Sequence, residues 1–204
     1  MKCCAITVLV LGAVLAATPA TAQTTGGDAR VLKTGDVLVH GDVSLVFQQT
    51  GSQGAVDKEL SLAFKPVVEG MLTSWLSLGG FLAVTYMHFW DTSDGQSHDG
   101  GSGIFEIGPR LAFWLGSFSV FHPYLAAKIG YSRFVIPGGP DGNGFVVGPE
   151  LGIAVEPIPG VLAFVSIGYE YHWWHIPSQG PDSRGTFDYK LHQMPVSFGI
   201  GAKF

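Results

Sequence analysis

The sequence contains very little cysteine and little charge, and it has no apolar run long enough for a transmembrane helix. Its two cysteines are neighbours, Cys3 and Cys4, at the start of the chain. Disulfides, thiolate zinc sites and cysteine nucleophiles are therefore excluded from the remainder. Charged residues make up 13% of the chain, the formal net charge is −5, and no basic cluster occurs. This charge pattern argues against nucleic acid as a partner.

The longest apolar run extends from Ala5 to Ala17. A helix that spans the membrane needs about 20 apolar residues, so this run is too short. Lys2 precedes the run, and the small residues Ala20 and Ala22 follow it at the spacing that signal peptidase requires. We therefore expect residues 1–22 to be a secretory signal peptide, residues 23–34 a polar periplasmic lead-in, and residues 35–204 the folded domain.

Hydrophobic residues nevertheless make up 47% of the sequence. In lipid, only helices and closed barrels satisfy every backbone polar group, so an apolar chain without a spanning helix favours a barrel. Segments that alternate between apolar and polar residues begin near Val37, Leu60, Leu76, Phe105, Leu125, Phe145, Val161 and Val196. Alternating segments of about ten residues are typical of transmembrane barrels. We predict an all-β fold: an eight-stranded antiparallel transmembrane up-and-down β-barrel.

The connections between the predicted strands alternate in length. The short connections are 70–74, 116–121 and 157–160, and the longer ones, rich in Gly, Asp and Ser, are 50–56, 91–103, 135–143 and 175–187. Short periplasmic turns and longer outer loops are characteristic of outer-membrane barrels. We therefore expect both termini in the periplasm.

Proline recurs once in each strand that returns towards the periplasm. The positions are Pro66, Pro109, Pro149 and Pro195. Proline within a sheet is normally confined to edges and bulges. The repeat therefore predicts a β-bulge at each of these four sites.

Aromatic residues gather near the ends of the predicted strands. We assign Phe89, Trp90, Phe134, Tyr171, Trp173 and Trp174 to the outer end, and Trp75, Trp114, Phe118, Phe121 and Phe204 to the inner end. Two aromatic girdles that flank an apolar band mark the lipid interfaces. A soluble β-sandwich or lipocalin-like barrel would show the same alternation but would turn these faces towards a core.

The face opposite the apolar band carries charge. Alternation places Asp42, Lys65, Glu106, Arg110, Lys128, Glu150, Glu156, Glu170 and Lys203 inside the barrel, with His40 and His172. Side chains fill an eight-stranded barrel, and an unpaired buried ion costs several kcal/mol. We predict a salt-bridge plug centred on Asp42, Lys65, Glu106, Arg110, Lys128, Glu150 and Glu170. A narrow polar path for ions or small solutes is the alternative.

Metal and cofactor motifs are weak. His172 and His175 are three apart, so in a strand their side chains point to opposite faces. Asp91, Asp94 and Asp99 could hold a cation through oxygen ligands, but their spacing fits no EF-hand and a solvated loop is the simpler interpretation. The Gly-x-Ser-x-Gly elbow of serine hydrolases does not occur. We predict no metal, no cofactor and no catalytic residue.

Several stretches resemble a known family. Leu60-Ser-Leu-Ala-Phe-Lys-Pro66, followed by Trp75-Leu-Ser-Leu-Gly-Gly80, resembles the first hairpins of the OmpA/OmpX-type small outer-membrane barrels. Ile107-Gly-Pro-Arg110 and Val147-Gly-Pro-Glu150 resemble repeats on the later strands of that β-barrel domain. The chain end resembles the C-terminal signal read by the barrel-assembly machinery, carried here by Val196, Phe198, Ile200, Ala202 and Phe204.

The resemblance implies a monomer in the bacterial outer membrane, in contact with lipid and lipopolysaccharide. Lipid A deacylases are similar in size but carry a His-x-Ser stretch, whereas His175-Ile-Pro-Ser178 has a different spacing. We therefore predict a structural or surface-interaction component of the envelope that is not an enzyme. A narrow porin-like channel is the alternative, and a lipid A-modifying enzyme is less favoured. The sequence names no partner for the outer loops.

Overall fold

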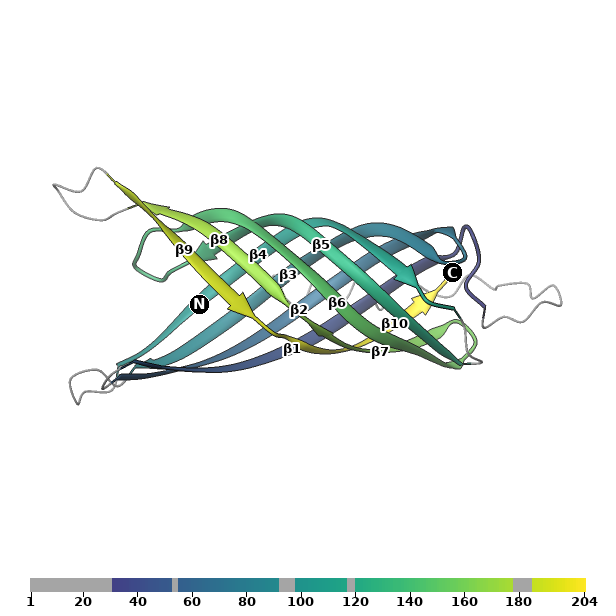
Figure 1. Ribbon diagram of the computed structural model, residues 1–204, viewed down its shortest axis with the longest axis horizontal. Coiled ribbons are helices and arrows are strands. Elements are labelled where there is room, and N and C mark those ends of the chain that lie inside the picture. The colour runs from purple at the N-terminus through teal and green to yellow at the C-terminus, as the bar shows by residue number, and fades with distance from the viewer. Residues whose placement is uncertain (1–30, 53–54, 92–97, 117–119, 178–184) are drawn as a thin grey trace.

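A computed structural model describes residues 31–52, 55–91, 98–116, 120–177 and 185–204. These residues form a ten-stranded antiparallel sheet (Figure 1). The strands are β1 (Val37–Ser52), β2 (Ala55–Thr73), β3 (Leu76–Asp91), β4 (His98–Trp114), β5 (Phe121–Val135), β6 (Gly142–Ile158), β7 (Val161–Gly168), β8 (Glu170–Pro177), β9 (Thr186–Gln193) and β10 (Val196–Lys203). Among the described residues, no helix is long and apolar enough to cross a membrane.

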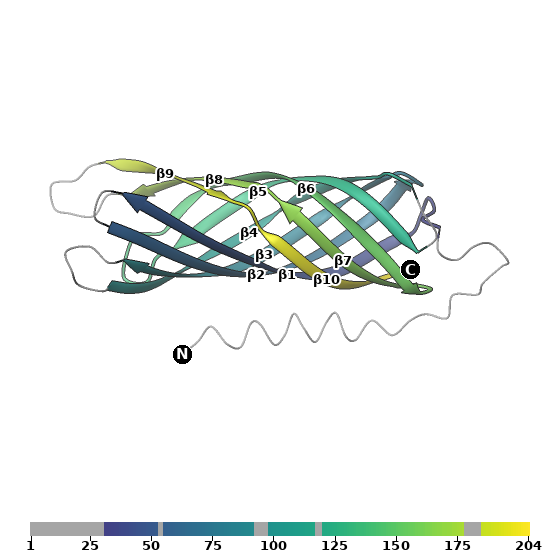
Figure 2. The same ribbon diagram turned by 60° about the horizontal axis from the view of Figure 1, so that its bottom comes forward.

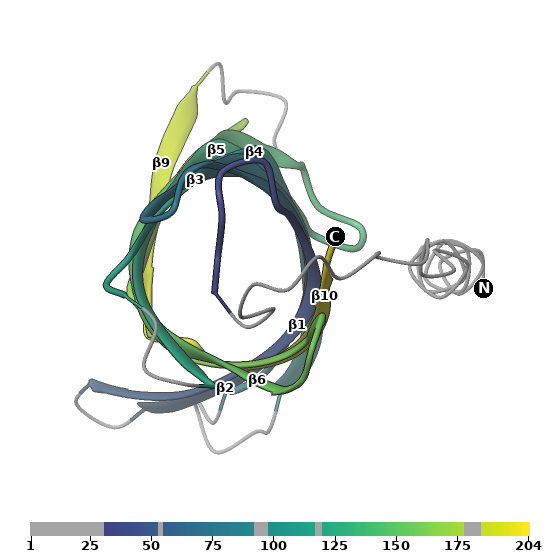
Figure 3. The same cartoon turned by 90° about the vertical axis from the view of Figure 1, so that its right-hand side faces the viewer.

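The sheet closes into a barrel. β1 pairs with β10, and β5 pairs with β6, so the view along the axis shows a ring (Figure 3). Tyr169 alone separates β7 from β8, and Met194 and Pro195 separate β9 from β10. β7 pairs with β10 and β8 with β9 in the same register. The ten segments therefore form eight wall strands, and the predicted fold class is confirmed.

The strands run obliquely around a long cylinder (Figures 1 and 2). β2, β4 and β6 end, and β3, β5 and β7 begin, at one end of the cylinder, which we call the turn end. The first and last strands meet there, because Val37 and Phe204 exchange two backbone hydrogen bonds of 2.9 Å. The opposite end is the loop end.

Several strands continue further towards the loop end than predicted. β1 and β2 pair as far as Ser52 and Ala55, so most of the loop predicted over 50–56 is strand. β9 extends the last strand well before its predicted start at Val196. Apolar alternation marks the lipid-facing band, so the extensions of β1 and β2 beyond it, which are mostly polar, could not be recognised from the sequence. The predicted loop residues 92–97 and 178–184 lie outside the described residues.

The wall near the loop end is paired less completely. Pairing of β1 with β10 ends at Leu45↔Val196. Beyond that point β9 pairs with β8, and the described residues show no ladder between β9 and β1. The Gln193 amide instead reaches β2 inside the barrel, where it donates to Glu59 over 3.1 Å and to Ser61 over 3.4 Å.

Apolar side chains cover the outside of the wall. Ile129, Leu151 and Ile200 are 57%, 55% and 68% exposed, and comparable residues occur on the other strands. Apolar exposure on this scale, distributed around a closed sheet, is expected where lipid replaces water.

The interior is layered along the barrel axis. On β4 the inward residues run Ala112, Arg110, Glu106 and Ile104. Ala112 belongs to an apolar cluster near the turn end, and Ile104 to a second cluster towards the loop end. Arg110 and Glu106 therefore lie in a charged layer between two apolar layers.

The segment before β1 helps to close the turn end, where it crosses the barrel mouth (Figure 3). Leu32 is buried in the same apolar cluster as Leu38 and Met71. The backbone is held by hydrogen bonds from Gly35 N to Met71 O (2.9 Å) and from Met71 N to Asp36 O (2.8 Å). The last residues of the predicted polar lead-in therefore contribute to the core.

The prediction of a bulge at each proline is wrong. The β2–β3 register passes from Phe64↔Val84 to Val67↔Phe81 without a shift across Pro66. The observed irregularities lie next to turns, at Met71/Thr73 and Val155/Ile158. Proline removes one N–H donor but is compatible with extended backbone, so a strand can pass through it and lose a single bond. Pro195 differs from the other three because it lies at the break between β9 and β10 and not within a strand.

Three of the predicted girdle residues lie inside the barrel. Trp114 and Trp174 are 4% and 0% exposed, and Phe134 stacks on Trp174 at 5.1 Å. Neighbouring residues in a strand point to opposite faces, so Trp173 and Trp174 could not both face lipid. The girdle residues that are at least 40% exposed are Trp75, Phe89, Phe121 and Phe204. Phe118 lies outside the described residues.

Candidate functional site: the charged interior

One ion-pair network spans the lumen. Lys65 on β2 donates to Glu150 on β6 over 3.0 Å, and Arg110 on β4 donates to Glu150 over 3.2 Å. Arg110 also binds Glu69 on β2. In the closed ring β2 and β6 lie on opposite sides, so these side chains meet across the interior. We call Lys65, Glu69, Arg110 and Glu150 the lower network.

Neutral groups complete the hydrogen bonding of the lower network. Tyr124 donates to Glu150 over 2.9 Å, and Ser77 donates to Glu69 over 2.8 Å. Trp114 in turn donates to Ser77 over 3.0 Å. Each carboxylate oxygen of Glu69 and Glu150 thus accepts at least one hydrogen bond. A buried ionic network is stabilised only when its members are satisfied in this way.

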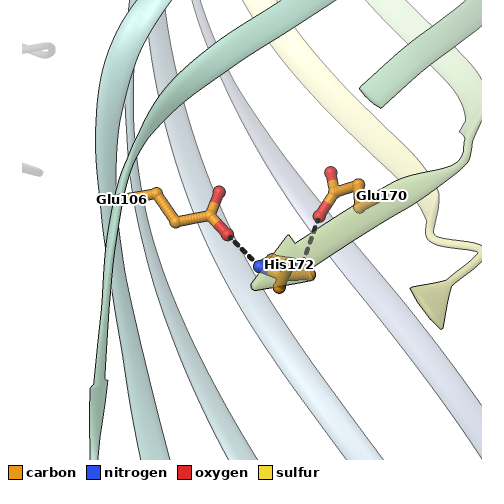
Figure 4. Close-up of side chains that lie close together, drawn as sticks. All are labelled: Glu106, Glu170 and His172. Carbon is orange, nitrogen blue, oxygen red and sulfur yellow. Dashed lines mark ion pairs between the residues drawn. The ribbon is translucent and has the colours of Figure 1, made fainter. Parts of the chain in front are cut away.

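A second cluster lies nearer the loop end, and we call it the upper cluster. Lys128 on β5 contacts Glu106 over 3.0 Å and Glu170 over 2.7 Å. His172 follows Glu170 by two residues on β8, so both side chains point inward. Figure 4 shows the imidazole between the two carboxylates, with Nδ1 3.2 Å from Glu106 and Nε2 3.6 Å from Glu170.

Two further polar groups lie near the turn end. His40 Nδ1 and Asp42 Oδ1 are 2.9 Å apart. Glu156 accepts from Lys203 over 3.0 Å and from the Gly160 N–H over 2.7 Å, and His122 lies 3.4 Å from it. Asp42 therefore pairs locally with a histidine rather than with the lysines or arginine of the central layer.

Two small cavities border the charged layer in the part of the chain that the structure describes. One, of about 20 Å³, is bordered by Lys65, Glu106, Lys128 and Glu170. Another, of about 10 Å³, is bordered by Lys65, Lys128, Glu150 and Glu170. A cavity needs a volume of roughly 10–15 Å³ to hold one water molecule. Each of these two cavities therefore has room for about one water molecule.

All seven residues of the predicted interior network face the lumen. Lys65, Arg110 and Glu150 meet in the lower network, Glu106, Lys128 and Glu170 meet in the upper cluster, and Asp42 lies apart. The prediction omitted Glu69 and Tyr124 from the network. Glu69 lies four residues after Lys65 on the same strand face, so the alternation could have identified it. Nothing in the sequence indicated that the hydroxyl group of Tyr124 would join the charged network.

The predicted assembly signal lies on the last strand. Val196, Phe198 and Ile200 point outward, and Phe204 is 45% exposed at the turn end. Ala202 is partly buried. Recognition of these residues by the assembly machinery stays a prediction.

No protein-family model matches the sequence, and a comparison with curated proteins gives no match. Solved structures do match. OprG from Pseudomonas aeruginosa superposes with a TM-score of 0.57 at 17% identity, covering 87% of this chain and 99% of that chain.

Two other outer-membrane proteins give similar values. Neisserial surface protein A matches with a TM-score of 0.52 at 19% identity, over 83% of this chain and 99% of that chain. Outer membrane protein W from E. coli matches with a TM-score of 0.51 at 15% identity, over 84% and 99% of the two chains. At these identities the likeness concerns the fold: this chain has the fold of the small bacterial outer-membrane β-barrels, with the apolar outer surface that such a fold presents to lipid.

Proposed function

We propose that the protein is a non-conducting outer-membrane β-barrel that serves as a structural or surface-interaction component of the envelope. The observation that carries the proposal is the pairing of Lys65 with Glu150 over 3.0 Å between opposite sides of the wall. Arg110 bridges Glu69 and Glu150 in the same layer. An ion that crossed this layer would have to displace satisfied, buried charges.

The free-energy cost of breaking the buried ion pairs supports a closed interior. The ionic side chains of the lower network are no more than 10% exposed. Removing one partner from such a group costs about 3–5 kcal/mol, because the other charge stays buried and unpaired. If the lower network opens at that cost, only a very small fraction of the molecules is open at any time.

We also propose that the protein has no catalytic role. The carboxylates and cations of the charged layer are bonded to one another in compact groups, which suits a structural network. Exposed His175 pairs with Asp188 over 2.6 Å at the edge of the wall. Ser178, the other residue of the stretch compared with the lipid A deacylases, lies outside the described residues.

Single-channel conductance in planar lipid bilayers tests the plug. We expect the wild type to give no steady openings and Arg110→Ala to give them, because the substitution removes the side chain that bridges β2 and β6. Arg133→Ala is the matched control, since Arg133 is 51% exposed and pairs with Asp141 outside the lumen. Steady wild-type openings that change when Arg110 or Glu106 is neutralised would favour the narrow channel instead.

We further propose a monomer surrounded by lipid and lipopolysaccharide and inserted by the barrel-assembly machinery. The exposed apolar side chains of β10 and Phe204 support this proposal. Phe204→Ser should lower the fraction of protein that assembles in the outer membrane. Phe121→Ser changes another exposed phenylalanine at the turn end and should leave assembly nearly intact. Equal loss in both variants would refute a specific terminal signal.

A further inference from the structure

The upper cluster presents a mixed set of potential metal ligands. Glu106 projects from β4, and Glu170 and His172 project from β8 into the same space (Figure 4). One ligand atom from each of the three residues lies within 4.8 Å of the others. Two carboxylate oxygens and one imidazole nitrogen are ligand types that zinc accepts.

Lys128 orients the two carboxylates. Its ammonium contacts Glu106 Oε2 and Glu170 Oε1. The other oxygen of each carboxylate, Glu106 Oε1 and Glu170 Oε2, then faces His172. Outer contacts of this kind commonly hold metal ligands in place. Two carboxylates paired with this one ammonium carry a net negative charge, which favours a cation.

His172 provides an independent indication of a ligand. Its side chain is 1% exposed. Within the part of the chain that the structure describes, neither ring nitrogen makes a hydrogen bond of acceptable geometry. The ring is nevertheless held in place, because it stacks on Trp174 at 5.0 Å, and Trp174 donates to Ser132 over 2.9 Å. A fixed, buried imidazole whose nitrogens face two carboxylates without a well-formed hydrogen bond is suited to coordination.

The distances allow a tetrahedral centre. His172 Nδ1 and Glu106 Oε1 are 3.2 Å apart, close to the roughly 3.3–3.6 Å that separates ligands bound to zinc at about 2.0–2.2 Å. Glu170 Oε2 faces the other ring nitrogen, Nε2, over 3.6 Å, so the Glu170 side chain would have to turn towards Nδ1 to share one metal ion with Glu106. The adjacent cavity of about 20 Å³, bordered by Glu106 and Glu170, has room for one water as a fourth ligand.

We infer that Glu106, Glu170 and His172 form a binding site for one divalent transition-metal cation of the Zn²⁺ class. The imidazole distinguishes this site from sites for Ca²⁺ and Mg²⁺, which take oxygen ligands. The site lies inside the barrel within the upper cluster, and it does not depend on whether the lower network blocks conduction.

Calorimetric titration of the detergent-purified, chelator-treated protein with Zn²⁺ tests the site. We expect one Zn²⁺ per chain, with no displacement by equimolar Ca²⁺ or Mg²⁺. His172→Gln and Glu170→Gln should each weaken binding at least about tenfold, because each removes or alters a ligand. Co²⁺ bound in place of Zn²⁺ should give visible absorption bands of a tetrahedral centre, and these bands should disappear in His172→Gln.

His175→Gln is the control, because His175 lies on the same strand but is 55% exposed and pairs with Asp188. It should bind Zn²⁺ as the wild type does. Far-ultraviolet circular dichroism checks that each variant is folded, and Glu170→Gln supplies the test if His172→Gln is not. The site is refuted if folded wild type binds no Zn²⁺, if neither interior variant weakens binding, or if His175→Gln alone abolishes it.

Discussion

At the scale of single residues, Arg110 determines how the lower network is connected. Its planar guanidinium reaches Glu69 and Glu150 at once, whereas Lys65 contacts Glu150 as a point charge. Arginine is the usual choice where one cation must bridge two carboxylates in a fixed geometry. The carboxylate of Glu69 has 0% side-chain exposure, so water cannot replace a lost arginine there.

Arg110→Met should destabilise the barrel by about 3–5 kcal/mol, because it leaves buried carboxylate charge without its partner. Arg133→Met should cost less than about 1 kcal/mol, because the exposed pair with Asp141 is well solvated. Urea unfolding of the protein in lipid vesicles, followed by tryptophan fluorescence, measures both. Equal losses in the two variants would contradict the central role of Arg110.

At the scale of elements, close backbone approach fixes how β6 and β8 pair. A Cβ atom on Gly144 would lie 1.7 Å from the carbonyl oxygen of Trp173. Gly144 pairs with Trp174, the large buried residue of the loop-end apolar cluster. By contrast, a Cβ atom on Gly70 of β2 would meet no atom within 4 Å.

Gly144→Ala should therefore cost about 1–3 kcal/mol, because the wall must shift to admit a methyl group. Gly70→Ala should be neutral or slightly stabilising, by up to about 1 kcal/mol, because alanine restricts the unfolded chain. Paired urea titrations of the two variants provide the measurement. A neutral Gly144→Ala would show that β6 and β8 are less closely packed than described.

At the scale of the whole molecule, the barrel reverses the usual arrangement of a soluble protein. Apolar side chains face outward, and most of the buried ion pairs lie in the middle of the interior between two apolar layers, while Glu156 and Lys203 pair near the turn end. Lipid solvates the outer surface, while mutual pairing compensates for the loss of water inside. The cost of an outward-facing charge should consequently depend on its depth in the bilayer.

Ile129→Arg and Phe121→Arg place the same charge at two depths of β5. Ile129 is 57% exposed near the middle of the strand, and Phe121 is 51% exposed at its start, beside the turn end. We expect a loss of about 2–4 kcal/mol for Ile129→Arg and about 0–1 kcal/mol for Phe121→Arg. Unfolding in vesicles measures both losses, and a soluble barrel would not show this difference.

Much of the fold could be predicted because strand geometry is simple. Side chains alternate with a period of two, so Leu62 and Lys65 could be assigned to opposite faces from their positions alone. Where a prediction departed from the alternation, it failed. The girdle assignment of Trp174 followed from its place near a strand end, although its parity with His172 put it inside. The strand β9 was missed although Phe187, Tyr189 and Leu191 alternate with polar residues. Leu191 packs inside the barrel, so this alternation does not mark a lipid-facing band as it does on the predicted strands.

The pairing of the interior charges could not be predicted in the same way. Alternation placed Lys65, Arg110 and Glu150 inside the barrel, but it did not say which of them meet. Closure and register decide this, since they bring β2 opposite β6 and set Arg110 between Glu69 and Glu150. The same closure brings His172 to Glu106. The sequence by itself thus determined which face each strand turns to lipid, because that depends on local periodicity, whereas only the tertiary structure decided the ion pairs and the His172 cluster, because these depend on contacts between distant strands.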